Sequence, residues 1–480
     1  MSDPVLSTDQ PIQLFEKQKR IFPKRVWGKY RKIKWLVMMI TLGIYYLAPF
    51  LRYDRGPHAP DQAILIDMTN SRAYFFFIEI WPQEVYYLSG ILILAAVGLF
   101  FVTSLFGRVW CGYTCFQTVW TDLFVWVERL IQGDRNARLK LAKSPWSFEK
   151  IRKIGLTHII WLMIGVCTGG AWVFYFNDAP TLLEQILHFD VEVSVLGWIL
   201  ALTLSTYLMA GFAREQVCTY MCPYARFQSA MFDKDSLIIG YDAGRGEDRG
   251  KRKKGDDMAT RGHCVDCTAC VQVCPMGIDI RDGLQMDCIA CGLCVDACNN
   301  VMDKLELPRG LVRYDTERGL QEKHDPMVEV KAKAKFIRPR TIWYSAIMLI
   351  VGSVILYGLT HRAPLDLHIL HDRNPLFVTM SDGTIRNGYE VKILNKTHGD
   401  KNYQLSIEGL EGYTARFQGV GALSMEKLPV YADSVAHFRL FVTAPKQGEH
   451  RLPIVMVLTD PETGVTDRYE TIFVSDGYDH

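Results

Sequence analysis

The chain carries the stretch Cys264-Val-Asp-Cys267-Thr-Ala-Cys270-Val-Gln-Val-Cys274-Pro275, followed by Cys288-Ile-Ala-Cys291-Gly-Leu-Cys294-Val-Asp-Ala-Cys298. Each run places three cysteines at two-residue gaps and a fourth after three more residues. This is the spacing of a duplicated bacterial ferredoxin, in which the fourth cysteine of each run reaches the other cluster. The sequence therefore predicts two [4Fe–4S] clusters, one held by Cys264, Cys267, Cys270 and Cys298 and one by Cys288, Cys291, Cys294 and Cys274.

The main alternative for these eight cysteines is a pair of zinc ions. Zinc sites usually combine two separated Cys-x2-Cys halves. Both runs here are triplets, and the first closes with Cys274-Pro275, although Asn299 replaces the proline after Cys298. The spacing therefore favours iron–sulfur clusters, which transfer single electrons and offer no substrate site of their own.

The chain also contains five long apolar blocks, which predict a membrane protein. Of its 480 residues, 49% are hydrophobic and 22% are charged. Each block is close to the ~20 residues with which a helix crosses the hydrocarbon core. The predicted spans are residues 35–51, 85–107, 155–177, 193–213 and 341–360. A shorter run at 73–81 contains Glu79, and we expect it to be an interfacial segment beside the second span.

Lysines and arginines in the loops predict the orientation of the spans. Residues 1–34 and 108–154 carry nine each, whereas residues 52–84 carry three and residues 177–191 carry none. We therefore expect a cytoplasmic N-terminus, a cytoplasmic segment 214–340 and a C-terminal part on the outer side. No signal peptide is expected, because mostly polar residues precede the first apolar block.

The distribution of the thirteen cysteines agrees with this orientation. All lie at or before Cys298, and none falls in a segment assigned to the outer side. A secreted disulfide protein would distribute them differently, so metal ligands or redox thiols in a reducing compartment are the better interpretation. The net charge of +2 argues against a nucleic-acid-binding protein.

Two further cysteine pairs form an internal repeat at the cytoplasmic ends of the second and fourth spans. They read Cys111-Gly-Tyr-Thr-Cys115 and Cys218-Thr-Tyr-Met-Cys222. The i, i+4 spacing predicts both sulfurs of a pair on one helix face, and two pairs could converge into one four-thiolate site. Soft thiolates select Cu(I), zinc or iron–sulfur clusters. The neighbouring Arg108, Arg214 and Arg226 are expected to favour the thiolate form.

The alternative for the membrane-edge cysteines is simple packing, which is common for cysteine. We expect packing for Cys167, inside the third span. His158, near the end of that span, is expected to hydrogen-bond at the interface, with a metal role as the second possibility. Residues 365–480 show short alternating runs separated by turn sequences such as Ser381-Asp-Gly383, which predict a β-sandwich. The nearby His361, His368 and His371 are expected to be incidental.

The whole chain resembles the FixG/CcoG/RdxA family of cytochrome oxidase accessory proteins. The resemblance rests on Val109-Trp-Cys-Gly-Tyr-Thr-Cys115, on the stretch from Arg214 through Cys222-Pro223 to Ser236, and on the ferredoxin runs. It implies an immunoglobulin-like C-terminal domain in the periplasm, a location in the bacterial inner membrane and a role in assembling the cbb3-type oxidase.

The resemblance further implies a cupric reductase that converts Cu(II) to Cu(I). Cys218 and Cys222, and by repeat Cys111 and Cys115, would then be the copper-handling cysteines, with oxidase assembly factors and a copper transporter as partners. Phe116 departs from the family pattern, because proline is expected after Cys115 as it follows Cys222. This departure leaves the role of the first pair less defined.

Two other functions stay open. One is an electron conduit that resembles the membrane ferredoxins linking quinol to a reductase, and the other is a non-enzymatic assembly scaffold. No nucleotide-binding glycine motif is visible, so a soluble electron donor or quinol is expected. The fold expected is a polytopic α-helical membrane protein with a ferredoxin insert and a C-terminal immunoglobulin-like β-sandwich. Its segments are a basic tail (1–34), four spans with the cysteine pairs (35–230), a charged linker (231–262), the ferredoxin domain (263–300), a second linker (301–340), the fifth span (341–360) and the sandwich (365–480).

Overall fold

The computed structural model describes residues 20–56, 59–250, 262–322, 336–397, 399–419 and 424–476, and the chain forms two compact units. The first contains most of the chain up to Ser353. The second contains the chain from Val354 together with two short stretches, Arg52–Ala63 and Phe76–Ile78. Parts of the predicted tail and linkers, including the basic run 251–254, lie outside the described residues.

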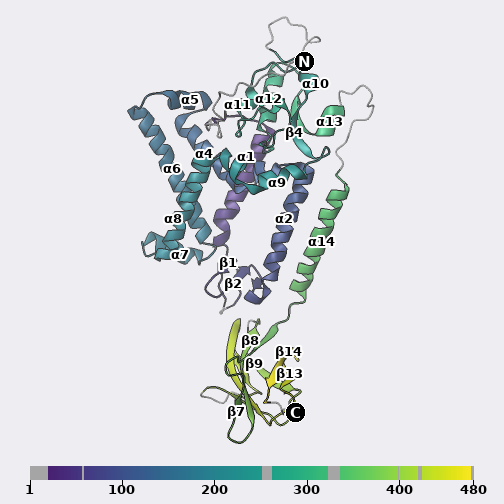
Figure 1. Cartoon of the computed structure of the whole chain (residues 1–480). Helices are drawn as coiled ribbons and strands as arrows, with labels where there is room; N and C mark the ends of the chain where they lie inside the picture. Colours follow the sequence, from purple (N-terminus) through teal and green to yellow (C-terminus); the bar gives the residue numbers. More distant parts are fainter. Residues whose placement is uncertain are drawn as a thin grey trace, which may run out of the picture. The chain divides into compact units, whose positions relative to one another are not determined.

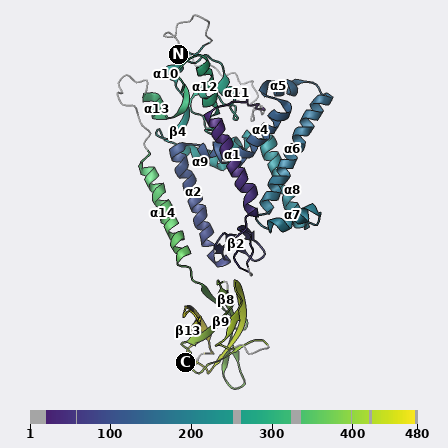
Figure 2. The same ribbon diagram turned by 180° about the vertical axis from the view of Figure 1, so that it is seen from behind.

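Within the described part of the chain, five helices are long and apolar enough to cross a membrane, as the sequence predicts. They are built on α1 (Lys29–Leu47), α2 (Tyr86–Phe106), α6 (Phe148–Val173), α8 (Val193–Leu208) and α14 (Pro339–Thr360). Figures 1 and 2 show α6 and α8 side by side. The third span begins earlier than expected, because Ser147 caps α6 by accepting a hydrogen bond from the Lys150 amide.

Helix α1 also begins earlier than expected and carries basic residues in its first turns. Arg31 and Lys34 are almost fully buried. Their side chains lie 2.8 Å and 3.8 Å from the Asp122 carboxylate, on a neighbouring helix. Buried charges need such partners, and the pairing explains how the helix can include residues that hydropathy assigns to a solvated tail.

That neighbouring helix is α4 (Phe116–Gln132), which the apolar blocks do not reveal. It is followed by α5 (Arg135–Lys143). One face of α4 packs on α6 and on a π-helical turn, Met209–Ala213, that continues α8. The contact is a buried cluster of Phe124, Val127, Trp161 and Ala210. A short helix α7 (Ala179–Leu187) connects α6 to α8.

The segment 73–81, expected as an interfacial segment, is folded into strands. Strand β1 (Ile64–Asp67) pairs antiparallel with β2 (Arg72–Phe75), and β3 (Ile78–Ile80) follows. Trp81 is buried, and the Arg72 guanidinium lies 3.8 Å from the centre of its ring. The strands are only three or four residues long, so they are too short to stand out in a hydropathy window.

The ferredoxin runs form a compact insert between two strands that pair with each other. Strand β4 (Leu237–Tyr241) precedes the runs and β5 (Val312–Thr316) follows them, and they are antiparallel from Leu237↔Thr316 to Tyr241↔Val312. The helices of this region are α9 (Pro223–Met231), α10 (Ala243–Gly246), α11 (Ala269–Gln272), α12 (Leu293–Lys304) and α13 (Glu317–Glu322). The chain therefore enters and leaves the insert at one place.

The second unit contains two antiparallel sheets, which confirms the predicted β-rich C-terminal region. One sheet has the order β10-β12-β8-β6, with β7 beside β8, and the other has the order β11-β9-β13-β14. Their inner faces share one core that includes Tyr389, Val391, Leu440, Met456 and Phe473. The strands are β6 (Leu365–His371), β7 (Val378–Thr379), β8 (Ile385–Asn395), β9 (Lys401–Glu408), β10 (Thr414–Phe417), β11 (Leu428–Val430), β12 (Ser434–Ala444), β13 (Arg451–Thr459) and β14 (Thr466–Val474).

Candidate functional site

The eight ferredoxin cysteines surround two cavities inside the insert. One cavity is lined by Cys264, Cys267, Cys270 and Cys298, with about 370 Å³ of empty space. The other is lined by Cys274, Cys288, Cys291 and Cys294, together with Cys270, with about 350 Å³. Each cavity is lined by one of the two four-cysteine sets expected from the spacing.

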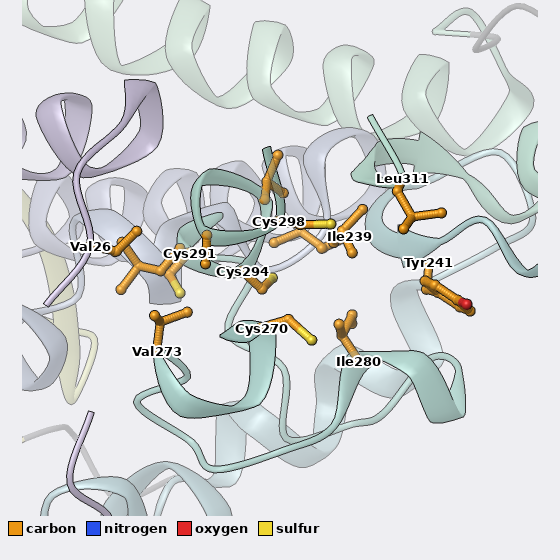
Figure 3. Close-up of a cluster of buried hydrophobic side chains, with 14 of the residues drawn as sticks. Val26, Ile239, Tyr241, Cys270, Val273, Ile280, Cys291, Cys294, Cys298 and Leu311 are labelled. Atoms are coloured by element: carbon orange, nitrogen blue, oxygen red, sulfur yellow. The ribbon is translucent and has the colours of Figure 1, made fainter. Parts of the chain in front are cut away.

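The surroundings of these thiols are mostly apolar, and Arg281 is the charged residue that lines the first cavity. Figure 3 shows Cys270, Cys291, Cys294 and Cys298 between Val26 on one side and Ile239, Tyr241 and Leu311 on the other. Burial raises the pKa of Cys270 and Cys274 to about 12 and that of Cys288 and Cys298 to about 11. Buried thiolates need a positive partner, and iron supplies it. The donor set therefore fits iron–sulfur clusters.

The backbone follows a similar path around each of the two membrane-edge cysteine pairs. Four residues before the first cysteine of each pair, the backbone turns at Gly107 (φ 61°) or at Arg214 (φ 41°). A short helical turn follows, α3 (Val109–Tyr113) in the first copy and a π-helical turn (Val217–Met221) in the second. The repeat seen in the sequence is thus a repeat of structure.

The expectation that each pair lies on one helix face is wrong. Cys111 lies within α3, but Cys115 is the N-cap of the next helix, α4. In the same way Cys218 lies in the π-helical turn and Cys222 is the N-cap of α9. Each pair therefore spans a break between two helices.

This geometry explains the difference between Phe116 and Pro223. Both occupy the first position of their helix, α4 or α9. Proline is pre-organised for that position, which needs no amide donor, but other residues are accepted there. The first copy begins its helix without proline, and the Phe116 side chain is 70% exposed.

The four membrane-edge thiols lie within electrostatic range of one another. The pKa of Cys218 rises to about 12, first because the thiol is buried and then because Cys115, Cys111 and Cys222 are near. Among the described residues, no three His, Cys, Asp or Glu side chains converge closely enough to enclose a single ion. The four sulfurs therefore form a loose group at one end of the helices.

Of the three arginines expected to favour the thiolate form, Arg108 acts in that direction. Arg108 lowers the pKa of Cys111, although burial, the larger effect, raises it overall. Arg214 is bound elsewhere, because its guanidinium lies 2.6 Å from the Glu128 carboxylate. The side chain of Arg226 lies outside the described residues. Loading a metal at these thiols would release protons.

Two polar residues hydrogen-bond to Cys111 of the first pair, and the sequence analysis does not select either of them. The Gln228 amide donates to the Cys111 sulfur at 3.4 Å, and Gln228 is fully buried. The Thr118 hydroxyl donates to the Cys111 carbonyl oxygen at 2.6 Å. Gln228 stands within the stretch from Arg214 to Ser236 that carries the family resemblance, but spacing alone does not link it to Cys111.

A cavity with about 490 Å³ of empty space opens between Cys218 and the ferredoxin insert. Its wall on the insert side includes Pro275 and Met276, next to Cys274, and Ile289, next to Cys288. The charged residues Lys34, Asp122 and Arg214, from outside the insert, also line this cavity. Cys218 of the second membrane-edge pair thus borders the same cavity as residues that neighbour Cys274 and Cys288 in the chain.

His158 and Cys167, both on α6, have neighbours other than these thiols. The His158 Nδ1 atom is 2.9 Å from the Tyr207 hydroxyl, and the His158 ring stacks on Phe212. Cys167, expected to be a packing residue, is exposed on α6. Outside the first unit, the His371 Nε2 atom bonds Asn387 and His361 stacks on Tyr357.

Comparison with protein families finds three matches. Residues 213–317 match a family described as a 4Fe-4S dicluster domain, and residues 88–135 match a 4Fe-4S binding domain. Residues 355–476 match the IG-like fold at the C-terminal of FixG. The second match contains Cys111 and Cys115 as its only cysteines.

Curated relatives cover almost the whole chain. The chain is 48% identical to the nitrogen fixation protein FixG of Rhizobium meliloti, over 96% of this chain and 93% of that protein. It is 46% identical to protein RdxB of Cereibacter sphaeroides, over 97% and 98% of the two chains. A more distant relative is the ferredoxin-type protein NapH of Haemophilus influenzae, 24% identical over 43% of this chain and 65% of that protein.

Proposed function

Since the chain belongs to the FixG/RdxA family of iron–sulfur redox proteins, we propose that it reduces Cu(II) to Cu(I) at the membrane edge. The observation that carries the proposal is the position of the four thiols of Cys111, Cys115, Cys218 and Cys222. They lie together, and the cavity at Cys218 is bordered by residues next to two of the ferredoxin cysteines. Thiolates stabilise Cu(I) over Cu(II).

The ferredoxin insert supplies the electrons in this proposal. Cys264, Cys267, Cys270 and Cys298 hold one [4Fe–4S] cluster, and Cys288, Cys291, Cys294 and Cys274 hold the other. Such clusters, when bound, deliver one electron at a time, which is what the conversion of Cu(II) to Cu(I) requires. The apolar walls around the cysteines keep water from the clusters and so tune their potential.

The cellular setting is part of the proposal. We place the chain in a bacterial inner membrane with the N-terminus and the ferredoxin insert in the cytoplasm and the C-terminal sandwich in the periplasm. The lysines and arginines of residues 1–34 and 108–154 support this orientation. Cu(I) made at the membrane edge would serve assembly of a cbb3-type oxidase through a copper transporter and assembly factors.

A test uses protein purified without oxygen and reduced before use. Cu(II) is added, and Cu(I) is followed with a chromogenic chelator. The parent is compared with a Cys218→Ser/Cys222→Ser variant and with Cys167→Ser as the matched control, because Cys167 lies away from the group. We expect Cu(I) from the parent and the control and little from the double variant. Equal yields from all three would remove the second pair from the mechanism.

A second candidate function is transfer of electrons to another redox partner without copper. The match of residues 88–135 to a 4Fe-4S binding domain favours it, because the four membrane-edge thiols would then hold iron. Iron analysis separates the two functions. Loss of iron in the Cys218→Ser/Cys222→Ser variant, with the ferredoxin signals unchanged, would support a further cluster and would contradict a copper site.

A further inference from the structure

We propose that electrons leave the ferredoxin insert through its second cysteine run, and that Gly112 and Tyr113 are the positioning residues that hold this run against the membrane-edge thiols. The exit loop is defined here as residues 286–291, which include Cys288 and Cys291. The identity of the final electron acceptor, Cu(II), rests on the proposed function. The contact of Gly112 and Tyr113 with the exit loop has a test of its own.

Side chains from outside the ferredoxin runs bind the backbone of the exit loop. The Tyr113 hydroxyl donates to the Cys291 carbonyl oxygen at 3.0 Å. The Arg108 guanidinium donates to the Met286 carbonyl oxygen, and the Tyr314 hydroxyl donates to the Ala290 carbonyl oxygen. Tyr113 and Arg108 flank Cys111 in the chain, so the exit loop is attached to the segment that carries the first membrane-edge thiol.

Gly112 allows the closest approach. A Cβ atom at this position would lie 2.6 Å from the Ile289 carbonyl oxygen and 3.0 Å from both the Ala290 carbonyl oxygen and the Cys291 Cα atom. Gly112 is not among the glycines with positive φ. The glycine is therefore needed for contact with the exit loop and not for a turn.

The internal repeat supplies a comparison within the same molecule. Counting from the first cysteine of each pair, Gly112 corresponds to Thr219 and Tyr113 corresponds to Tyr220. Tyr113 is buried, whereas Tyr220 is 70% exposed. The second copy thus keeps the Cys-x-Tyr-x-Cys motif, but it has threonine at the position of Gly112 and its tyrosine is exposed. The special features of the first copy belong to its contact with the exit loop.

The two sets of cysteines differ in their surroundings outside the insert, although the cavity inside each set is lined by residues of the insert alone. Cys267 is exposed. By contrast, Cys218 shares its cavity with Pro275 and Ile289, which neighbour ligands of the second set. The first set is therefore placed to receive electrons from outside, and the second set to pass them on.

The electron given to Cu(II) in each turnover is replaced by one electron from a single donor. In each turnover, a cluster held by the second set of cysteines would supply one electron to Cu(II), which becomes Cu(I), and the electron transfer itself needs no proton. A low-potential one-electron carrier protein, the class of donor we assign to the exposed Cys267 side, restores that electron. Dithionite replaces this donor in the test.

The test uses the full-length holoprotein reduced with dithionite, with Gly112→Thr and the milder Tyr113→Phe as variants. Tyr220→Phe is the matched control. Bleaching and recovery of the iron–sulfur absorbance report how fast Cu(II) reoxidises the clusters. Because outer contacts of metal ligands typically change activity 10–100-fold, we expect Gly112→Thr to slow reoxidation by ~10-fold or more and Tyr220→Phe to leave it unchanged. Unchanged reoxidation in Gly112→Thr with full iron content would overturn the proposal.

Electron paramagnetic resonance of the reduced clusters separates this inference from the proposed function. Cys267→Ser and Cys291→Ser variants assign the two signals. We expect Gly112→Thr and Tyr113→Phe to alter the signal assigned to the second set and to leave the first unchanged, whether or not copper is reduced. A change confined to the first signal, or no change in either, would contradict the exit loop even if the parent makes Cu(I).

Discussion

At the scale of single residues, Glu128 shows how buried charge organises the membrane edge. Its carboxylate on α4 is fully buried and lies 2.6 Å from Arg214, 2.9 Å from Arg20 and 3.1 Å from Arg138. Burial acts to raise the pKa of Glu128, but the arginines, Arg214 first, hold it below its ordinary value. The carboxylate therefore ties the start of the second cysteine repeat to α4 and α5.

We predict that Glu128→Gln destabilises the protein by about 3–5 kcal/mol, because it leaves buried guanidinium groups without their counter-charge. Thermal unfolding in detergent measures the change. The matched control is Glu149→Gln, which removes an exposed carboxylate 2.7 Å from Lys153 and should alter the unfolding temperature little. A loss in the control as large as that of Glu128→Gln would contradict the role of burial.

The same carboxylate predicts a dependence on pH. A group whose pKa is lower in the folded state contributes stability above its unfolded pKa, here 4.5, and that stability is lost as the pH falls towards the folded pKa. The parent should therefore lose unfolding temperature below about pH 4.5 more steeply than Glu128→Gln. If unfolding temperature falls in parallel for the two proteins as the pH is lowered, Glu128 does not contribute this pH-dependent stability.

At the scale of elements, breaks between helices bring the four membrane-edge thiols to one end of the helices. Gly107 ends α2 with φ 61°, and a Cβ atom there would collide with the Leu237 carbonyl oxygen at the start of β4. The break lets the chain turn into α3 and present Cys111 to the exit loop. Continuation of α2 as one straight helix would carry Cys111 away from Cys218.

We therefore expect Gly107→Ala to cost at least about 1–2 kcal/mol from its left-handed backbone alone, with the collision added. Gly98→Ala in the same helix is the control. A Cβ atom at Gly98 meets only the Met348 methyl group at 3.7 Å, so this change should be neutral or stabilising. Thermal unfolding and the yield of iron-loaded protein measure both. Similar behaviour of the two variants would contradict the role of the break.

The sequence predicts some of these elements and not others, for physical reasons. The five spans follow from hydropathy, and the grouping of Cys264 with Cys298 follows from ferredoxin spacing, because both signals are local or repeated. Helix α4 carries charges at Asp122 and Glu128 that lower its hydropathy, and their partners come from distant segments. Gln228 and Gly112 are recognisable only once Cys111 and Ile289 are seen beside them.

At the scale of the whole molecule, cofactor and sandwich belong to different units. Every cysteine lies in the first unit, and the sandwich of the second has a core of its own. A cofactor bound only by the folded state stabilises the unit that binds it.

Calorimetry of the full-length protein should therefore show two transitions. Removal of iron by oxidation and chelation should lower the temperature of the transition that belongs to the first unit and leave the temperature of the other unchanged. A shift of one transition alone would identify it as the unfolding of the unit that binds the clusters. A shift of both transitions would show that the units unfold together.

The pairing of β4 with β5 has a consequence for the history of the chain. The ribbon from Leu237↔Thr316 to Tyr241↔Val312 closes the ferredoxin segment into a loop whose two ends meet. A module with adjacent ends can be inserted into a scaffold without displacing the flanking helices. The membrane scaffold can thus gain, lose or exchange its electron source by one recombination event, while the repeated cysteine pairs, which belong to the scaffold, keep their places.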